Sequence, residues 1–280
     1  MVKPSNEPLV SVILAIHNGA DYCREAVDSV LAQEYSNFEL VILDDASTDN
    51  TADIIREYAE NDSRIVFETL PKQESLSDVL NIGIGKSSGK YVSRIDHDDR
   101  MTPKRLKLQV QLMEKHPDVV VCGGFLRYIY EDGSEGRIRK YPLDDKDLKK
   151  RMFVFSPFAH PSVMIRRSAL EQVRGYPKGI RTVEDIMLWF KLSRVGKFAN
   201  IPEILLEYRI RAGSESLGKI ISTFNKTNEV RYWAMDQEGI KPSFYGWTLW
   251  KVQQLVFIVL RFLPSRLVIW FYDLGKRLFG

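Results

Sequence analysis

The stretch Tyr91-Val92-Ser93-Arg94-Ile95-Asp96-His97-Asp98-Asp99 decides the fold of this chain. Its first five residues have the character of a strand, and the strand ends in three carboxylates within four positions. Three like charges this close repel one another, so they are tolerated only where solvent or a cation offsets them. Carboxylate oxygens suit Mg²⁺ or Mn²⁺, and such ions usually bind through one or two carboxylates plus substrate phosphates. Taken alone, three aspartates in this arrangement are more typical of a solvated acidic turn than of a binding site.

Alternating strands and helices surround this motif. Apolar runs at 10–16, 38–43, 65–69 and 91–95 predict strands, and apolar residues at helical spacing predict helices at 21–33, 51–58 and 77–84. Nearly continuous apolar strands that alternate with helices are typical of a parallel sheet covered on both faces. Further along, the pattern predicts a helix at 103–116, a strand at 119–130 that leads into a hairpin at 131–133, a strand at 163–165 and a helix from 183 onward.

Polar clusters follow three of the predicted strands directly. These clusters are His17-Asn18, Asp44-Asp45 and the run from Asp96 to Asp99. In open α/β sheets, ligands bind beyond the carboxyl ends of the strands, so we expect the three clusters to converge on one crevice. This convergence favours a binding site over a solvated acidic turn.

Composition places the chain among globular proteins. With 280 residues and 44% hydrophobic content it can bury a substantial core, as one medium domain with an appendage or as two small domains. Its two cysteines, Cys23 and Cys122, form no CxxC motif, and we interpret them as reduced core thiols of a cytosolic protein. No basic segment followed by an apolar segment opens the chain, so we do not expect export.

The C-terminal part has a different composition. Residues 241–280 carry six Lys or Arg and one Asp, a net charge of +5, whereas the rest of the chain carries −2. Three of the five tryptophans also lie there, beside apolar runs at 255–260 and 267–272. These runs are shorter than the roughly 18 to 20 residues of a spanning helix. They favour helices at a membrane surface with anionic lipid, and the alternative is a pair of helices that pack on the catalytic domain or in a dimer.

Several ordered motifs together resemble the family 2 glycosyltransferases with a GT-A fold, over roughly residues 9–212. The matching stretches are Val10-Ser11-Val12-Ile13-Leu14, His17-Asn18, Asp44-Asp45-Ala46-Ser47-Thr48-Asp49, Asn81-Ile82-Gly83-Ile84, Ser88-Gly89-Lys90-Tyr91, Arg94-Ile95-Asp96-His97-Asp98-Asp99 and Glu184-Asp185-Ile186-Met187-Leu188-Trp189. The resemblance implies an α/β catalytic domain at 1–215, with a mixed, mainly parallel sheet flanked by helices. C-terminal amphipathic helices at 216–280 would follow as a membrane-associating segment.

The resemblance also implies a donor site. Asp45 would accept a hydrogen bond from the base, with Asp44 as the alternative contact, and the wrong base would leave a buried charge unpaired. Asp96 would lie near the ribose and Asp98 would bind Mn²⁺ or Mg²⁺, with Asp96 and Asp99 as further or alternative ligands. The ion would offset the charge on the departing nucleoside diphosphate. Arg94, two positions before Asp96, would face the same side and hold the diphosphate.

On the acceptor side, the resemblance implies that Asp185 is the catalytic base. A sugar hydroxyl is a poor nucleophile, so a base must take its proton during attack on the anomeric carbon. Glu184 would orient a hydrogen bond or exchange roles with Asp185, and His160 matches an acceptor-side position. The alternatives are an acidic first helical turn for the carboxylates and a structural histidine for His160.

Two departures from the family pattern concern the donor. Many relatives have an aromatic residue before the Asn, whereas this chain reads Ala15-Ile16-His17-Asn18. Either His17 would stack on the base or the stacking contact would be absent, and Ala15 and Asn18 would be further donor-binding residues. Arg211 stands where the family often has His. A guanidinium cannot bind a metal ion, but it can hold a diphosphate with two hydrogen bonds.

These expectations combine into one activity. The chain is expected to be an inverting, metal-dependent hexosyl- or N-acetylhexosaminyltransferase that uses a UDP-sugar and a lipid-linked saccharide acceptor for cell-surface polysaccharide or lipopolysaccharide. It would lie in the cytoplasm, peripheral on the inner face of the cell membrane, and would bind no nucleic acid. The alternatives are a sugar nucleotidyltransferase, which usually has a Gly-rich phosphate loop that Asn18-Gly19-Ala20 does not provide, and a non-catalytic membrane-surface protein of the same fold.

Overall fold

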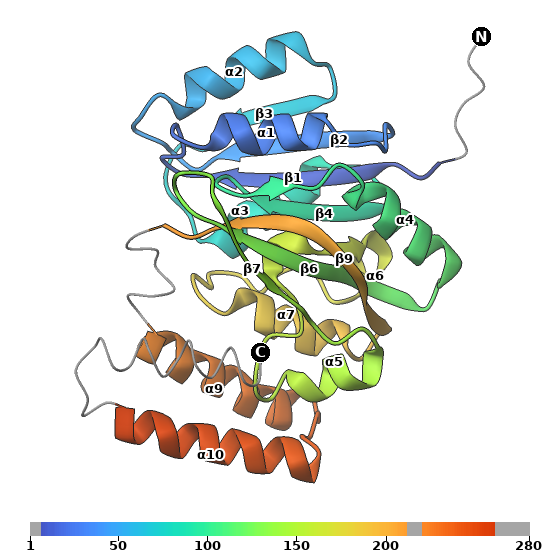
Figure 1. The fold of residues 1–280 in the computed structure, drawn as a ribbon, viewed down its shortest axis with the longest axis vertical. Helices are drawn as coiled ribbons and strands as arrows, with labels where there is room; N and C mark the ends of the chain where they lie inside the picture. The colour runs from blue at the N-terminus through green and yellow to red at the C-terminus, as the bar shows by residue number, and fades with distance from the viewer. Residues whose placement is uncertain (1–6, 212–219, 261–280) are drawn as a thin grey trace.

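The computed structural model describes residues 7–211 and 220–260, and these residues form a sheet of nine strands with helices on both faces (Figure 1). Along the chain the elements are β1 (Val10–Ile16), α1 (Cys23–Leu31), β2 (Phe38–Asp44), α2 (Thr51–Asn61), β3 (Ile65–Thr69), α3 (Leu76–Lys86), β4 (Tyr91–Asp96), β5 (Arg100–Met101), α4 (Arg105–Lys115), β6 (Val119–Ile129), β7 (Glu135–Arg139), α5 (Asp145–Arg151), the 3₁₀ turn η1 (His160–Ser162), β8 (Met164–Arg166), α6 (Arg167–Gln172), α7 (Glu184–Leu192), β9 (Lys197–Arg209), α9 (Ile220–Gln237) and α10 (Phe244–Leu260).

The N-terminal half of the sheet is parallel, as predicted. The order is β3-β2-β1-β4-β8-β6-β9-β5, with β7 paired to β6. Strands β3, β2, β1 and β4 run parallel to one another, β8 runs antiparallel between β4 and β6, and β9 runs parallel to β6. The sheet is therefore mixed and mainly parallel on its N-terminal side, which confirms the predicted fold class.

Burial explains why the first strands form where the sequence predicts them. All residues of β1 except Ala15 are buried, because helices cover both faces of the sheet. Helix α1 presents Cys23, Ala26, Val27 and Val30 to the core at helical spacing. Cys23 and Cys122 are free and buried, which confirms their interpretation as core thiols.

Register brings the carboxyl ends of three strands together. Ile16 of β1 pairs with Asp44 of β2, and Ala15 pairs with Asp96 of β4. The polar residues that follow each strand therefore start from the same edge of the sheet. The predicted convergence of these clusters is a direct result of parallel pairing.

The C-terminal half of the sheet contains a long strand that the sequence pattern did not predict. Strand β9 has 13 residues and pairs with β6 along most of its length. Pro202 interrupts its apolar pattern, and the register shifts beside it, between Gly124 and Phe125. Short β5 and α6 were also not predicted.

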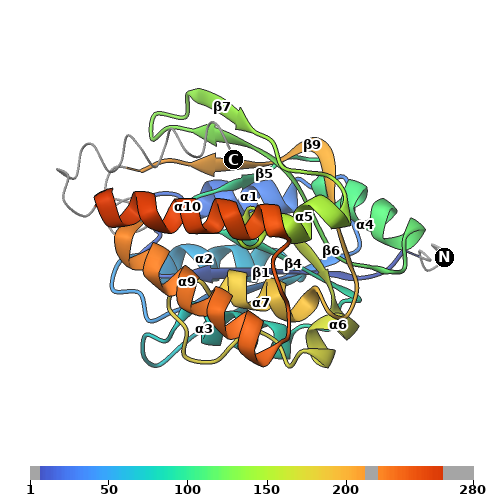
Figure 2. The ribbon, with the colours of Figure 1, turned by 90° about the horizontal axis from the view of Figure 1, so that it is seen from below.

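Helices α9 and α10 pack on the catalytic domain. Figure 2 shows both on the same side of the molecule, next to α5 and α7. Trp250 is fully buried, contacts Phe153 with ring centroids 5.8 Å apart, and belongs with Ala234 to the apolar cluster that contains Trp189 of α7. Gln253 donates a hydrogen bond to Val154 O. One face of α10 therefore packs on the domain, which was the alternative to a membrane-surface helix.

The other face of α10 is exposed and apolar. Phe244 is 86% exposed, and Trp247, Val252, Leu255 and Ile258 are also exposed. Among the described helices, none is long and apolar enough to cross a membrane. The predicted boundary at 215–216 and the apolar run at 267–272 lie outside the described residues.

Candidate active site

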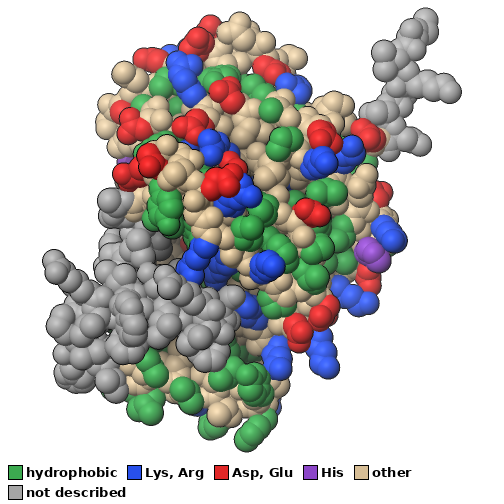
Figure 3. All heavy atoms as spheres, viewed as in Figure 1, with side chains coloured by type: hydrophobic (Ala, Val, Ile, Leu, Met, Phe, Trp, Pro, Cys, Tyr) green, Lys and Arg blue, Asp and Glu red, His purple; other side chains and the backbone are tan. Residues whose placement is uncertain are grey.

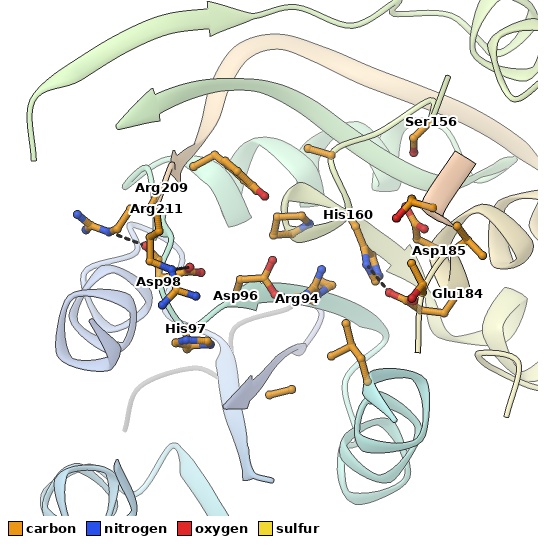
Figure 4. Close-up of a pocket in the computed structure, with 18 of the residues that line it drawn as sticks. Arg94, Asp96, His97, Asp98, Ser156, His160, Glu184, Asp185, Arg209 and Arg211 are labelled. Carbon is orange, nitrogen blue, oxygen red and sulfur yellow. Dashed lines mark hydrogen bonds and ion pairs between the residues drawn. The ribbon is translucent and has the colours of Figure 1, made fainter. Parts of the chain in front are cut away.

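A single large cavity of about 1210 Å³ lies at the carboxyl ends of β1, β2 and β4 and extends to α7, β6 and α9. Ten of the residues singled out from the sequence are involved. Those that line the cavity are Ala15, His17, Asp45, Arg94, Asp96, Asp98, His160, Glu184, Asp185 and Arg211. Figure 4 shows Asp98 and Arg211 toward one side, Glu184 and Asp185 toward the other, and Asp96 and Arg94 between them. The cavity therefore brings the predicted donor and acceptor residues together.

Asp45 and His17 form one wall of this cavity. Asp45 Oδ1 accepts a hydrogen bond from the backbone N–H of Glu74 at 2.9 Å, and His17 Nδ1 lies 2.7 Å from the backbone oxygen of Asp45. Burial raises the pKa of the Asp45 carboxyl. Two fixed contacts hold this acceptor in place, as selective recognition of a ligand N–H requires.

Asn18 and Asp44 are not among the residues that line the cavity. Asn18, whose φ is 50°, accepts a hydrogen bond from Thr48 N through Oδ1 and so ties the loop after β1 to the loop after β2. Asp44 is fully buried and accepts a hydrogen bond from Ser47 N. Both side chains shape the loops that carry His17 and Asp45.

Arginines engage the two cavity-facing carboxylates of the acidic motif. Arg94, 4% exposed, forms an ion pair with Asp96. Arg211 Nε lies 2.9 Å from Asp98 Oδ2, and the guanidinium of Arg211 lies over the ring of Tyr22. Burial, followed by the charge of Asp96, raises the pKa of Asp98. Positive and negative groups thus alternate along this wall of the cavity.

Asp99 points away from the cavity and holds the end of β9. Its Oδ1 accepts a hydrogen bond from Arg209 N at 2.9 Å, and the side chain is buried. Burial raises the pKa of Asp99 well above its ordinary value, with Asp96 and Asp98 adding to the effect. Arg209 donates in turn to the backbone oxygen of Asp98 and pairs with Glu25 at 2.6 Å. Arg209, which the sequence did not single out, therefore fixes the acidic motif against α1.

The carboxylates fit a divalent cation that arrives with its substrate. Among residues 7–211 and 220–260, no group of three or more His, Cys, Asp or Glu side chains is arranged to hold a metal ion. Asp96 and Asp98 nevertheless both face the cavity, with side chains 33% and 17% exposed. Mg²⁺ and similar ions commonly use one or two carboxylates and complete their shell with phosphates and water. The donor set matches that arrangement.

Glu184 and Asp185 open α7 at the other end of the cavity. Burial and the charge of Asp185 raise the pKa of Glu184 to about 7, and burial raises the pKa of Asp185. His160 Nδ1 lies 3.6 Å from Glu184 Oε1, and His160 Nε2 lies 2.8 Å from the hydroxyl of Tyr176. Burial, followed by the charge of Arg94, lowers the pKa of His160 well below its ordinary value, so the His160–Glu184 contact involves a neutral imidazole.

The backbone that precedes these carboxylates is strained. Val183, the residue before α7, has φ 65° and ψ 17°, a left-handed conformation that β-branched residues rarely adopt. Strain of this kind costs about 1 to 3 kcal/mol and persists where the surroundings over-determine it. Val183 itself is 9% exposed and belongs to the apolar cluster with Trp189. Packing of its side chain therefore helps set the direction in which α7 begins.

Comparison with known proteins identifies the family. The model of the family described as Glycosyl transferase family 2 matches residues 11–174, which is more than half of the chain. The chain belongs to this family. It is 34% identical over 227 residues to the putative glycosyltransferase EpsE of Bacillus subtilis, with 80% of each chain covered. It is 33% identical over 206 residues to the O-antigen biosynthesis glycosyltransferase WbnJ of Escherichia coli, with 72% of this chain and 80% of WbnJ covered.

Solved structures of other glycosyltransferases share the fold. TarS of S. aureus in complex with UDP-GlcNAc superposes with a TM-score of 0.64 at 18% identity, covering 79% of this chain and 66% of TarS. The mannosyltransferase PcManGT of Pyrobaculum calidifontis, in complex with GDP-Man and Mn²⁺, superposes with a TM-score of 0.62 at 16% identity, covering 95% of this chain and 84% of PcManGT. The predicted GT-A fold is confirmed, and glycosyl transfer is the activity that the family supports over the two alternatives.

Sequence reasoning missed several residues of this family 2 site. Tyr176 follows Gly175 between the strand predicted at 163–165 and the helix predicted from 183, and nothing in the pattern indicated its contact with His160. The cavity residues Arg137 and Arg139 lie on β7, where alternation of Arg, Ile and Arg was the available signal. The further cavity residues that were missed are Tyr128, Tyr130, Tyr141, Arg181 and Lys226.

Proposed function

We propose that this family 2 glycosyltransferase is an inverting, cation-dependent enzyme that transfers a hexosyl or N-acetylhexosaminyl group from a nucleotide-diphosphate donor to a saccharide acceptor. The observation that carries the proposal is that one cavity is lined by Asp45, Asp98 and Asp185, each from a different part of the chain. A base acceptor, a cation ligand and a general base are the three groups that such a transfer needs.

The donor would occupy the side of the cavity formed by β1, β2 and β4. Asp45 Oδ2 is available to accept the imide N–H of uracil because Oδ1 already bonds to Glu74 N, and the His17 ring would lie against the base. Asp96 and Asp98 would hold Mn²⁺ or Mg²⁺, which would neutralise charge on the diphosphate. Arg94 and Arg211 would donate to the phosphate oxygens.

The acceptor would approach from the side of Asp185. Asp185 would take the proton of the attacking hydroxyl as its oxygen bonds to the anomeric carbon. The bond from that carbon to the nucleoside diphosphate would break on the opposite face, so the leaving group departs with the electron pair and the configuration inverts. A raised pKa strengthens Asp185 as a base once it is ionised. Glu184, which opens α7 next to His160, would orient the hydrogen bond between Asp185 and the attacking hydroxyl.

Replacement of the base tests the proposal. Asp185→Asn should lower sugar transfer by roughly 10² to 10⁴-fold, the usual contribution of a general base, while nucleoside diphosphate binding stays intact. Asp53→Asn, on the exposed face of α2, is the matched control because its side chain is 79% exposed. Retained transfer in Asp185→Asn would remove the base assignment.

Uracil is the proposed base of the donor. An aspartate acceptor matches the imide N–H of uracil, and TarS was solved with UDP-GlcNAc whereas PcManGT was solved with GDP-Man. A screen of UDP-, GDP- and dTDP-sugars by slow donor hydrolysis in the absence of acceptor tests the base and the sugar together. Preference for a GDP-sugar would contradict uracil as the base of the donor.

The acceptor is proposed to be a lipid-linked saccharide in the assembly of cell-surface polysaccharide or lipopolysaccharide. WbnJ is named for O-antigen biosynthesis, and the exposed face of α10 is apolar and aromatic, with Phe244 86% and Leu255 63% exposed. Such a face suits peripheral attachment to the inner face of the cell membrane.

Vesicle sedimentation tests this attachment. The double variant Phe244→Ser and Leu255→Ser changes exposed side chains and leaves the buried Trp250 in place. It should stop sedimenting with anionic vesicles, whereas Val66→Ser on β3, which is 40% exposed, should sediment like the wild type. Unchanged sedimentation of the double variant would refute attachment through α10.

A further inference from the structure

The cavity is larger than a donor site requires. Its volume of about 1210 Å³ exceeds the roughly 300 to 1,000 Å³ of a typical small-molecule pocket. Beyond Asp185 it continues between the β6–β7 hairpin, the η1 region and α9, and the residues there were not assigned to the donor. We call this part the basic end, after the four basic residues that line it: Arg137, Arg139, Arg181 and Lys226.

Two arginines of the basic end lie over tyrosine rings. Arg137 and Arg139 are separated by one residue on β7, so they share a face of the strand. The guanidinium of Arg137 lies 5.3 Å from the ring centroid of Tyr128, and that of Arg139 lies 4.9 Å from the ring centroid of Tyr141. Stacking of this kind fixes the orientation of a guanidinium group.

The charge of this part of the cavity is positive. None of the salt bridges between residues of the described ranges involves Arg137, Arg181 or Lys226, and Lys226 instead donates to Thr182 Oγ1. Arg151 stands behind Arg139, on the same Tyr141 ring, with its ring-centroid distance 5.7 Å. Burial and the charge of Arg139 lower the pKa of Arg151 to about 10, which shows that cations are crowded here. Figure 3 shows Lys and Arg side chains gathered over β7 and the elements beside it.

The basic end also adjoins the proposed base. Tyr141, with the Arg139 guanidinium over its ring, lines the same cavity as Asp185. Ser156 and Phe158 also line it, and Figure 4 shows Ser156 on the same side as Asp185. A ligand that placed a hydroxyl at Asp185 would extend its next groups toward Arg137 and Arg139.

We propose that the basic end binds a phosphate carried by the acceptor, with Arg137 and Arg139 as its main contacts. The inference rests on the proposed function, because it takes the group near Asp185 to be the acceptor. Two sources supply such chemistry: the diphosphate that joins a saccharide to a lipid carrier, and a phosphate substituent on the saccharide itself. Paired guanidinium groups bind either of them through two parallel hydrogen bonds each.

Titration calorimetry with two probes tests the proposal. Farnesyl diphosphate represents a lipid-linked diphosphate and glucose 6-phosphate represents a phosphorylated sugar. Each is titrated into the wild type, the double variant Arg137→Gln and Arg139→Gln, and the control Arg127→Gln. Arg127 belongs to the same hairpin and carries the same charge, but it pairs with Glu135 and is not among the cavity residues. Every titration is run with and without UDP and Mn²⁺. These occupy the donor side, so probe binding that persists in their presence occurs elsewhere in the cavity.

The double variant should bind at least one probe about tenfold more weakly than the wild type, since a hydrogen bond to a charged group contributes at least about one decade in affinity. Arg127→Gln should bind like the wild type, and Arg137→Lys with Arg139→Lys should be intermediate because charge remains without the planar fork. Preferential loss of farnesyl diphosphate indicates the lipid-linked source, and preferential loss of glucose 6-phosphate indicates the phosphorylated saccharide.

Equal affinity of the wild type and the double variant for both probes would overturn the inference, as would an equal loss in Arg127→Gln. Donor hydrolysis is measured in the same proteins and should be unchanged in the double variant. Donor hydrolysis by a wild type that binds neither probe would leave the proposed function in place and refute phosphate binding at the basic end. Probe binding without turnover of any nucleotide-sugar would instead remove the proposed function.

Discussion

Replacement of Trp250 by alanine tests whether α10 is part of the catalytic domain. Trp250 is fully buried, its Nε1 donates to Asn228 Oδ1 at 2.6 Å, and its ring contacts Phe153 and Tyr232 at centroid distances of 5.8 and 4.9 Å. Truncation of a buried aromatic side chain costs about 3 to 5 kcal/mol of unfolding free energy. Loss of the indole hydrogen bond adds no cost beyond this range, because Asn228 Oδ1 still accepts a hydrogen bond from Arg231 in the variant.

Guanidinium unfolding followed by circular dichroism measures this loss. We expect Trp250→Ala to lower the unfolding free energy by about 4 kcal/mol, equivalent to roughly 10 °C in Tm for a domain of this size. Trp247→Ala is the matched control, because Trp247 lies on the same helix but is 45% exposed, and its effect should stay within about 0.5 kcal/mol. A loss below about 1 kcal/mol for Trp250→Ala would refute the packing argument and favour α10 as a separate segment.

Three further predictions follow from the site and the sheet. Asp185→Asn removes the charge that, after burial, raises the pKa of Glu184, so the Glu184 pKa of about 7 should fall in this variant when followed by NMR titration; an unmoved pKa would contradict the coupling. Asp98→Asn should weaken binding of Mn²⁺ in the presence of UDP about tenfold or more by electron paramagnetic resonance, and normal affinity would transfer the role to Asp96. Gly89→Ala should destabilise by about 1 to 3 kcal/mol, because a Cβ there would lie 2.6 Å from Ser11 N. Gly85→Ala on α3, with nothing within 4 Å of its Cβ, should instead gain up to about 1 kcal/mol, and equal effects of the two in thermal unfolding would count against the model of close approach.

The N-terminal half of the fold was predictable because its signals are local. Strands β1, β2 and β4 are short apolar runs that end in polar residues, and their parallel pairing requires only that helices separate them. The same pattern also placed Asp45, Asp96 and Asp98 at one edge of the sheet before any pairing was known. Asp185 needed the family motif, since nothing local shows which strand ends α7 will face.

What sequence reasoning missed depends on contacts between distant segments. Strand β9 is interrupted by Pro202, and its partner β6 lies about 80 positions earlier, so no local pattern indicates the pairing. The arginines of β7 follow the predicted hairpin at 131–133, and charge on a strand does not reveal whether its side chains face a cavity. The run at 244–260 is apolar on two faces, and composition alone does not distinguish a face covered by protein from a face covered by lipid.

The alternation of arginine and aspartate along the donor wall has a consequence for how a donor would enter. Arg94 is already paired with Asp96, and Arg211 with Asp98, so the guanidinium groups are oriented before any phosphate arrives. Under the proposed function, Asp96 and Asp98 would hold the cation while Arg94 and Arg211 would bind the phosphates. Binding is then an exchange of counterions inside the protein, and little side-chain order has to be created. Departure of the nucleoside diphosphate with its cation would reverse the exchange. The aspartates and arginines of the donor wall would then pair with each other again.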